Sequence, residues 1–570
     1  MNPKQLRAPF SKTIEARPHT AVYTMHKYFA RRPWNVFSEL ISHYSSPHDI
    51  VLDPFCGGGV TVVESLKLGR KAVGIDINPL ATYVTEMQTR SIDINSLSQG
   101  FLEVRGGVKE EISSLYSTSC VSCNAEAVAD WIEWDEPTKR ILRLKYDCPI
   151  CDVTREKPPD RKDMILAEKI ERTFTQSVKS RKLWFPETRI PHGDKTNSLL
   201  RRKINAFHEL FTRRNLLALS ILLNEIEKIR DSQTREFLKF AFSSSLKWAS
   251  RQSHLRGRIV EGWAMHAYWI YPKSLEINVW NTFERRTRAV LRGKEYSSEQ
   301  IRESRGAART FKNLLDSNAS YFILNKSATR LPLPSSSIDA VITDPPYGAN
   351  VNYGELSDFW FIWMSDGKTI PKSDEVIINR TQGKALGEYE KLLFSVLKEC
   401  YRVLKPRRYL VSTFNSKDMR VVASFITAAS RAGFTLDPKG VLYQKPIRPY
   451  GTTFHAMQIG AFVGDFIFTF TKDPRSSSAP RTAKGELGKV EGNLIGLIYK
   501  AEKNGITEPE LREEAYRVLI PFLAKHSRSD MGLCWQLVDF FETKMNKHEL
   551  HFKDLRRAIT EQRRRIFLQQ

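Results

Sequence analysis

One short run of residues, Asp344-Pro345-Pro346-Tyr347, follows an apolar stretch and has the composition of a reactive loop. Two prolines fix the backbone and remove two N–H donors, so the carbonyl groups before them face no local competition. The Asp344 carboxylate and the neighbouring carbonyl form an acceptor pair that suits an amino group with two hydrogens. Tyr347 adds a flat face on which a nucleobase can stack. The run predicts a site for the amino group of a base; the alternative is a loop without a function.

A glycine-rich turn near the start of the chain, Gly57-Gly58-Gly59, lies between two apolar runs that end in Asp53 and Asp76. Glycine lets a ligand approach the backbone without a clash with a Cβ atom. Between a strand and a helix, such a turn forms a ligand site at the carboxyl edge of a parallel sheet. Asp76 lies about 20 residues after the turn, where a carboxylate accepts hydrogen bonds from ribose hydroxyls.

The turn lacks two features of phosphate-binding loops, the G-x-G-x-x-G spacing and the lysine of a P-loop. This difference favours a nucleoside ligand without phosphates, which S-adenosylmethionine is. NAD, a flavin and a purely structural tight turn are the alternatives.

Two Cys-x-x-Cys pairs, Cys120 with Cys123 and Cys148 with Cys151, are separated by 24 residues. Four thiolates suit a tetrahedral structural zinc ion, and a complete thiolate set leaves no open position for catalysis. The separation is slightly longer than the usual ~15–20 residues and leaves room for two or three strands between the pairs. The alternatives are reduced cysteines without a metal and a redox pair. The other three thiols are expected to be packing residues: Cys56, Cys400 and Cys534.

The composition limits the class of protein. Of the 570 residues, 41% are hydrophobic, which is enough for a core and for about two to four domains. Lys and Arg number 88 against 64 Asp and Glu, and the net charge of +24 indicates a polyanionic partner, nucleic acid before a membrane surface. No apolar run approaches the ~18 residues that span a bilayer, and no apolar signal segment is present, which predicts a cytoplasmic protein. Seven cysteines argue against a disulfide scaffold.

The motifs must be positioned by strands and helices in alternation. Apolar runs at 50–52 and 71–75 flank the glycine turn and a helical stretch at 61–68, which is the βαβ unit of a doubly wound sheet. Similar patterns return between 340 and 470, so two separated stretches predict one α/β domain. Between them, residues 201–320 hold 23 Lys and Arg against 12 Asp and Glu. This basic stretch is expected to contact the substrate; a solvated helical face is the alternative.

The expected organisation therefore has five parts. Residues 1–95 carry the glycine turn and residues 321–473 carry the Asp-Pro-Pro-Tyr run, and together they form the α/β domain. Residues 96–320 form an insertion with the cysteine pairs and the basic helical region. Residues 474–489, which contain proline and three consecutive serines, form a linker, and residues 490–570 form a helical C-terminal region.

Two motifs of the sequence resemble those of a known family. Asp53-Pro54-Phe55-x-Gly57-x-Gly59 resembles the cofactor motif of S-adenosylmethionine-dependent amino-methyltransferases. The Asp-Pro-Pro-Tyr run resembles their catalytic motif, in the form typical of adenine N6 enzymes. The order of the motifs, with a long insertion for target recognition between them, is that of the α group of DNA amino-methyltransferases. The run 353–360 is similar to adenine-specific DNA methylases that carry a zinc ribbon. The resemblance covers about half of the chain.

The resemblance implies a doubly wound, Rossmann-like methyltransferase sheet, interrupted by a zinc-ribbon plus helical insertion and followed by a helical tail. It places the segment 26–34 over the methionine end of the cofactor. Ser327 stands where many members have an acidic residue beside the cofactor adenine, a departure from the pattern. The implied cofactor-binding residues are Asp53, Phe55, Cys56, Gly57, Gly59, Asp76 and Ser327.

The implied reaction is methyl transfer from S-adenosylmethionine to the N6 amino group of a flipped-out adenine in double-stranded DNA. The transfer is a direct in-line displacement without a covalent intermediate, so Cys56 is not a nucleophile. A restriction–modification or anti-phage setting, with companion subunits, is consistent with such an enzyme.

Two other functions remain open. An RNA base methyltransferase acting on adenine or on guanine N2 is one, because Asp-Pro-Pro-Tyr-Gly also occurs in enzymes that methylate transfer RNA. An inactive DNA-binding subunit with a methylase fold is the other.

Overall fold

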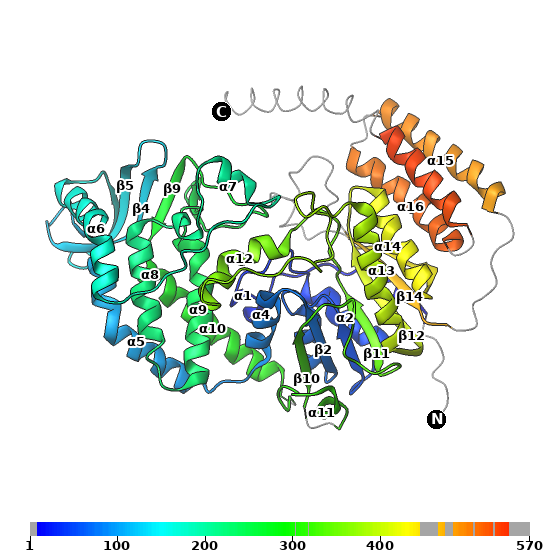
Figure 1. The fold of residues 1–570 in the computed structure, drawn as a ribbon, viewed down its shortest axis with the longest axis horizontal. Helices are drawn as coiled ribbons and strands as arrows, with labels where there is room; N and C mark the ends of the chain where they lie inside the picture. Colours follow the sequence, from blue (N-terminus) through cyan, green and yellow to red (C-terminus); the bar gives the residue numbers. More distant parts are fainter. Residues whose placement is uncertain are drawn as a thin grey trace.

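The computed structural model describes residues 8–302, 304–316, 319–444, 465–473, 483–504, 508–527 and 530–545. Figure 1 shows a central sheet covered by helices, an insertion of helices and strands beside it, and a group of C-terminal helices. The expected α/β fold with an inserted region is confirmed. Among the described residues, no helix combines the length and the apolar character needed to cross a bilayer.

The central sheet has seven strands. In spatial order they are β10 (Tyr321–Asn325), β2 (Lys71–Asp76), β1 (Ile50–Asp53), β11 (Ile338–Thr343), β12 (Leu404–Phe414), β14 (Asp465–Thr471) and β13 (Thr435–Gln444). The first five are parallel, and β14 runs antiparallel to its neighbours β12 and β13. Since β1 pairs with β11, the stretches on either side of the insertion form one sheet.

Strand residues alternate between two hydrophobic cores, one on each face of the sheet. Val51 packs in the first core with α2 (Trp34–Tyr44), α3 (Val60–Lys67) and α4 (Pro79–Thr89). Ile50 and Leu52 pack in the second core with α13 (Leu386–Val403) and α14 (Met419–Ala432). The alternation follows from the period of two along a strand. Helices on both faces explain why β1 and β11 are buried throughout.

The insertion combines an antiparallel sheet with long helices. The strands are β3 (Ser117–Ser119), β4 (Glu126–Asp135), β5 (Arg140–Cys148), β6 (Val153–Lys157) and β9 (Lys273–Ile277), which pairs with β4. The helices are α5 (Ile94–Ser114), α6 (Arg161–Ser180), α8 (Arg213–Ile226), α9 (Ser232–Ala249) and α10 (Val279–Gln300). Shorter elements of the chain are α1 (Ala21–Thr24), α7 (Asn197–Arg201), η1 (Phe207–Leu210), β7 (His254–Arg256), β8 (Ile259–Glu261) and α11 (Phe311–Leu315).

Helix α12 (Tyr353–Met364), which closely follows the Asp-Pro-Pro-Tyr run, joins the insertion to the central sheet. The buried Glu355 carboxylate accepts hydrogen bonds from Lys195 N at 2.7 Å and from Asn379 Nδ2 at 2.6 Å. The Tyr268 hydroxyl, from the insertion, donates to the Glu355 carbonyl at 2.9 Å. Two loops of the insertion are therefore held against the helix that follows the expected catalytic residues.

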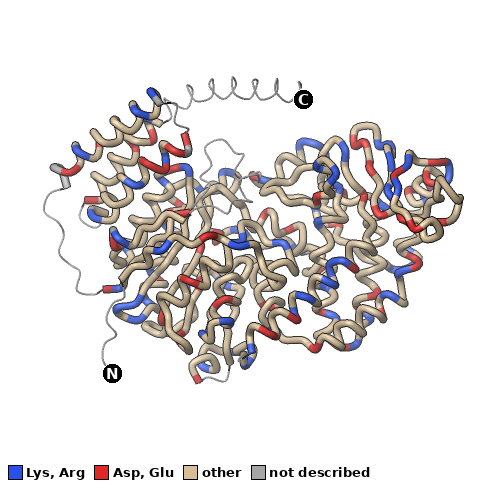
Figure 2. Tube along the Cα trace, turned by 180° about the vertical axis from the view of Figure 1, so that it is seen from behind, with Lys and Arg blue, Asp and Glu red and all other residues tan. Residues whose placement is uncertain are grey.

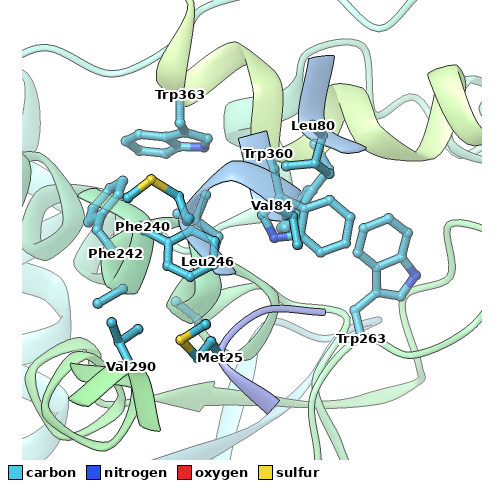
Figure 3. Close-up of a cluster of buried hydrophobic side chains, with 14 of the residues drawn as sticks. Met25, Leu80, Val84, Phe240, Phe242, Leu246, Trp263, Val290, Trp360 and Trp363 are labelled. Atoms are coloured by element: carbon cyan, nitrogen blue, oxygen red, sulfur yellow. The ribbon is translucent and has the colours of Figure 1, made fainter. Parts of the chain in front are cut away.

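Aromatic side chains gather at this junction (Figure 3). Trp263 of the insertion stacks on Trp360 of α12, with ring centroids 5.2 Å apart, and both side chains are buried. Phe29, from the N-terminal segment, packs edge-on against the two rings at 5.5 and 5.6 Å. Burial of these large rings joins the N-terminal segment, the insertion and α12 in one core.

The C-terminal helices α15 (Ala483–Asn504) and α16 (Glu508–His526) contribute Leu494 and Tyr516 to the second core. Residues 531–545 are also helical and add Phe541 to this core. Helix α15 begins inside the stretch 474–489, which was expected to be a linker. Ala483, Lys484, Glu486 and Leu487 favour a helix, but Gly485 and Gly488 among them do not, so the local sequence did not reveal this helix start. Residues 474–482 and 546–570 lie outside the described part of the chain.

Truncation of Trp360 tests the contribution of the aromatic junction. Because Trp360→Ala removes a fully buried ring, we expect the free energy of unfolding to fall by about 3–5 kcal/mol. Guanidinium unfolding followed by circular dichroism measures the change. Tyr499→Ala is the matched control, since that side chain is 68% exposed, and it is expected to change stability by less than about 0.5 kcal/mol. Equal losses in the two variants would contradict the assignment.

Candidate active site and metal centre

An open cavity brings the two sequence motifs together. One part of its wall is the turn 53–58 with Asp76, and another part contains Asp344 and Pro346. Residues 28–32, the start of α12 and the loop around 370–376 complete the wall. A ligand on the glycine turn and a group held by Asp344 therefore share one enclosure.

Asp53, at the end of β1, connects the glycine turn with β11. Its carboxylate is 3% exposed and accepts hydrogen bonds from Thr343 Oγ1 and Thr61 Oγ1, each at 2.6 Å, and from Phe55 N at 3.1 Å. Burial raises the pKa of Asp53 to about 6, although these donors act in the opposite direction. Asp53 lines the cavity, but its two oxygens are used to hold the turn and the strand in register.

The glycine turn lets α4 approach its backbone on one side and Arg31 on the other. Gly59 begins α3 with φ of +80°, and a Cβ atom there would lie 2.6 Å from Gln88 Oε1. A Cβ atom on Gly58 would lie 2.6 Å from Arg31 Nε, so the Arg31 guanidinium rests directly on the turn. Side chains at these positions would displace α4 or Arg31.

Asp76, at the end of β2, faces the cavity beside the turn. Its Oδ2 accepts a hydrogen bond from Gly57 N and its Oδ1 one from Asn78 N, both at 2.9 Å. Burial raises the pKa of Asp76 to about 7, although the two backbone donors lower it. The carboxylate thus titrates near neutral pH and keeps acceptor positions for a further donor.

Asp344, at the end of β11, lies in a network of donors. Arg32 Nε donates to its Oδ2 at 2.7 Å, and Thr413 Oγ1 donates to its Oδ1 at 2.5 Å. The Tyr347 hydroxyl also donates to Oδ1. Burial raises the pKa of Asp344, while the Arg32 charge and these donors act against the rise.

Further cavity residues escaped the sequence analysis. Tyr28 and Tyr353 stack with ring centroids 5.9 Å apart and planes 15° from parallel, and both rings line the cavity. The buried Glu375 accepts a hydrogen bond from Gly354 N through Oε1, whereas its Oε2 has no hydrogen-bond partner among the described residues. Sequence reasoning marked the segment 26–34 but gave no reason to select Arg31 or Arg32 within it.

Most of the residues predicted for the cofactor meet at the cavity. Gly59 is not among its lining residues and packs against α4 instead. Of the predicted catalytic residues, Asp344 and Pro346 line the cavity, and Pro345 and Tyr347 do not. The predicted cofactor residues in the wall are Asp53, Phe55, Cys56, Gly57, Asp76 and Ser327.

The four cysteines of the two pairs converge at the end of the insertion's sheet. Their sulfur atoms all lie within 4.8 Å of one another. The Cys120 and Cys151 sulfurs are 3.9 Å apart, and those of Cys123 and Cys148 are 3.6 Å apart. A tetrahedral zinc ion with Zn–S bonds of about 2.3 Å requires sulfur separations of about 3.8 Å. The residues therefore fit a structural zinc ion.

Metal analysis tests this arrangement. We expect roughly one zinc ion for each purified chain and a loss of bound zinc in Cys148→Ser, because three thiolates hold the ion less tightly than four. Cys400→Ser is the matched control, since this buried thiol lies in the second core, and it should retain the zinc. Elemental analysis by plasma mass spectrometry gives both values. Wild-type protein without metal after expression in zinc-supplemented medium would exclude the site.

Comparisons with known proteins agree with this geometry. Residues 6–87, which contain the glycine turn, match the family model described as DNA methylase, of the N6/N4 type. The chain is 22% identical over 410 residues to the type II methyltransferase M.MjaII of Methanocaldococcus jannaschii, a match that covers 69% of each chain. It is 40% identical over 55 residues to the type II methyltransferase M1.MboII of Moraxella bovis, covering 10% of this chain and 20% of that relative. These findings support the resemblance of the motifs: the chain is similar to DNA methylases of the N6/N4 type and to type II methyltransferases.

Proposed function

We propose that this protein transfers the methyl group of S-adenosylmethionine to the N6 amino group of a flipped-out adenine in double-stranded DNA. The observation that carries the proposal is the shared cavity, whose wall holds both the glycine turn with Asp76 and the Asp344 carboxylate. A cavity that can hold a nucleoside beside an acceptor for an amino group suits the transfer of a methyl group between two bound molecules.

The wall of the cavity fits a cofactor with positive charge. Glu375 Oε2 is a buried acceptor without a partner among the described residues, and an ammonium group would satisfy it. Arg31, resting on Gly58, is placed for a carboxylate at the same end of the turn. Asp76 supplies an acceptor for ribose hydroxyls. Together these groups would hold the ammonium, the carboxylate and the sugar of S-adenosylmethionine.

The chain's own groups act on the target amine. Asp344 and the Pro345 carbonyl accept its two N–H bonds and direct the nitrogen lone pair toward the cofactor, and Tyr347 stacks on the base. When bound, S-adenosylmethionine supplies a methyl group whose bond to sulfur breaks as the bond to nitrogen forms. The positive charge that develops on the amine is stabilised by the Asp344 carboxylate beside it. The adenine choice rests on the Asp-Pro-Pro-Tyr form of the motif.

Exposed cations beside α12 support a nucleic acid substrate. Arg201, Arg202 and Lys203 are all exposed, and the Arg202 guanidinium lies 4.0 Å from the ring centroid of Trp269, which is 38% exposed. Figure 2 shows Lys and Arg gathered along this upper part of the insertion, where α7 lies. Since the adjacent Tyr268 bonds to α12, this basic surface is held near the cavity. Cations interleaved with an aromatic ring suit phosphates and bases.

The cysteine cluster is proposed to bind structural zinc that stabilises the sheet of the insertion. It lies at the ends of β3, β5 and β6 and does not line the cavity. Zinc therefore has no part in the proposed transfer.

Incubation with labelled S-adenosylmethionine and unmodified duplex DNA, followed by nucleoside mass spectrometry, tests the function. N6-methyladenine is the expected product. If N4-methylcytosine is found instead, the proposed mechanism stands, but the target base is cytosine. Product on RNA but not on DNA would favour the RNA alternative, and absence of any product would favour a binding subunit.

Removal of the amine acceptor tests the role of Asp344. We expect Asp344→Ala to lower kcat by about 10²–10³-fold, because the transition-state charge loses its carboxylate. Asp366→Asn, at an exposed aspartate, should leave kcat unchanged. Steady-state methylation of DNA gives both values, with binding of S-adenosylmethionine measured by calorimetry as a check of folding. Undiminished activity in Asp344→Ala would refute the proposed chemistry.

The pH dependence of cofactor binding tests Asp76. Its pKa is raised to about 7, so the carboxylate gains charge as the pH rises through 7 and becomes a better acceptor for ribose hydroxyls. We expect the affinity for S-adenosylmethionine to increase across this range in the wild type. Asp76→Asn cannot ionise, so it should bind more weakly at high pH and lose this part of the pH dependence. Calorimetric titrations below and above pH 7 distinguish the two proteins, and identical profiles would exclude the role.

A further inference from the structure

Arg32 reaches from the N-terminal segment into the place where the target base is expected. Its Nε donates to Asp344 Oδ2 at 2.7 Å, and its Nη2 donates to the Tyr347 hydroxyl. The guanidinium carbon lies 4.9 Å from the centroid of the Tyr347 ring. At its outer end, Nη1 donates to both carboxylate oxygens of Asp465 at 3.0 Å. The side chain is 18% exposed, so the charge is largely withdrawn from solvent.

These contacts are of the kind that the target base would make. A guanidinium is planar, carries N–H donors and stacks on aromatic faces, as an aminopurine does. Arg32 donates to the catalytic carboxylate and covers one face of the tyrosine. The ring of Phe414 also packs against Tyr347, with ring centroids 4.8 Å apart and planes 53° from parallel. It therefore limits the space around the tyrosine ring.

The hydrogen bonds to Asp344 also indicate that Arg32 occupies the position of a substrate amine. A carboxylate oxygen accepts about two hydrogen bonds. Oδ1 already takes one from Tyr347 and one from Thr413. Arg32 holds Oδ2, the oxygen that remains for a substrate amine. Arg32 takes one of the two acceptor positions on this oxygen and lies over the Tyr347 ring, so a base on Tyr347 would compete with Arg32 for the ring face and meet it at the same oxygen.

Asp465 provides a second anchor for the arginine. It begins β14 and is 18% exposed, so it lies at the outer side of the network. An arginine that releases Asp344 keeps its ion pair with Asp465 and is not left as a buried, unpaired charge, which would cost several kcal/mol. The same outward position faces solvent, where a DNA phosphate would add a second partner.

We propose that Arg32 occupies the target-base pocket of the DNA-free protein as a stand-in for the base, and that the incoming adenine displaces it toward Asp465. The proposal rests on the proposed function, because it uses Asp344 and Tyr347 as the base-binding groups. It adds a competitor within the chain: a base that enters must replace the hydrogen bond that Asp344 loses.

Oligonucleotide binding tests the competition without requiring catalysis. The probes are single-stranded oligodeoxyadenylate and an abasic oligonucleotide of equal length, each titrated in the presence of S-adenosylhomocysteine. The ratio of their Kd values isolates the contribution of the base, since loss of the Arg32 charge weakens the phosphate contacts of both probes equally. In Arg32→Ala we expect the preference for the adenine probe to rise by about tenfold or more, the scale of one hydrogen bond to a charged group.

Two further variants serve as controls. Lys228→Ala removes a cation that is 63% exposed and does not line the cavity, and it should leave the ratio at its wild-type value. Arg32→Lys keeps the ion pair with Asp344 and should remain within about twofold of the wild type. An unchanged ratio in a folded Arg32→Ala protein would overturn the proposal, and so would an increase in Arg32→Lys as large as that in Arg32→Ala.

The methylation assay distinguishes failure of the stand-in role of Arg32 from failure of the proposed function. If the wild type methylates DNA and the ratio does not change in Arg32→Ala, the stand-in role alone fails. If the wild type methylates neither DNA nor RNA and the ratio is unchanged, the proposed function fails with it.

Discussion

The parallel pairing of β1 with β11 is the interaction on which the rest of the site depends. It places the end of one strand, with the glycine turn, beside the end of the other, with the Asp-Pro-Pro-Tyr run. Thr343 confirms the register by donating to Asp53 across the two strands at 2.6 Å. Carboxyl ends of neighbouring parallel strands meet at one edge of a sheet, and ligands bind there. Without this pairing the two motifs would be separate loops with no common cavity.

The insertion follows β2 and α4, and the chain returns from it in β10, which pairs with β2. Its loops are held on α12 by the bonds of Lys195 and Tyr268 to Glu355, and by the stacking of Trp263 on Trp360. Helix α12 begins shortly after the Asp-Pro-Pro-Tyr run. A displacement of the insertion would therefore move residues close to the proposed base-binding groups. The proposed DNA-binding surface and the proposed base site are thus connected through a single helix, α12.

Local patterns in the sequence were sufficient for the α/β fold, the glycine turn and the cysteine cluster, because each depends on residues close together in the chain. Spacing could also suggest that β1 and β11 share a sheet. It could not find Arg32, whose partners Asp344 and Asp465 lie 312 and 433 positions away. Nor could it show that Asp53 is used to join two strands. Composition placed a linker at 474–489, and α15 begins within it at Ala483 despite Gly485 and Gly488, because Leu494 and Ile498 of this helix are buried in the second core.

Charge is divided between the surface and the cavity, and the division suits the two molecules of the proposed reaction, a polyanion and a cationic cofactor. The chain as a whole carries +24, a field that attracts a polyanion over long distances. The cavity wall contains Asp53, Asp76, Asp344 and Glu375, and burial raises the pKa of each of them. A cation bound beside such carboxylates favours their charged form and is stabilised by it in turn. Arg32 meets this demand when the base is absent, and its removal leaves an acidic pocket ready for an amine.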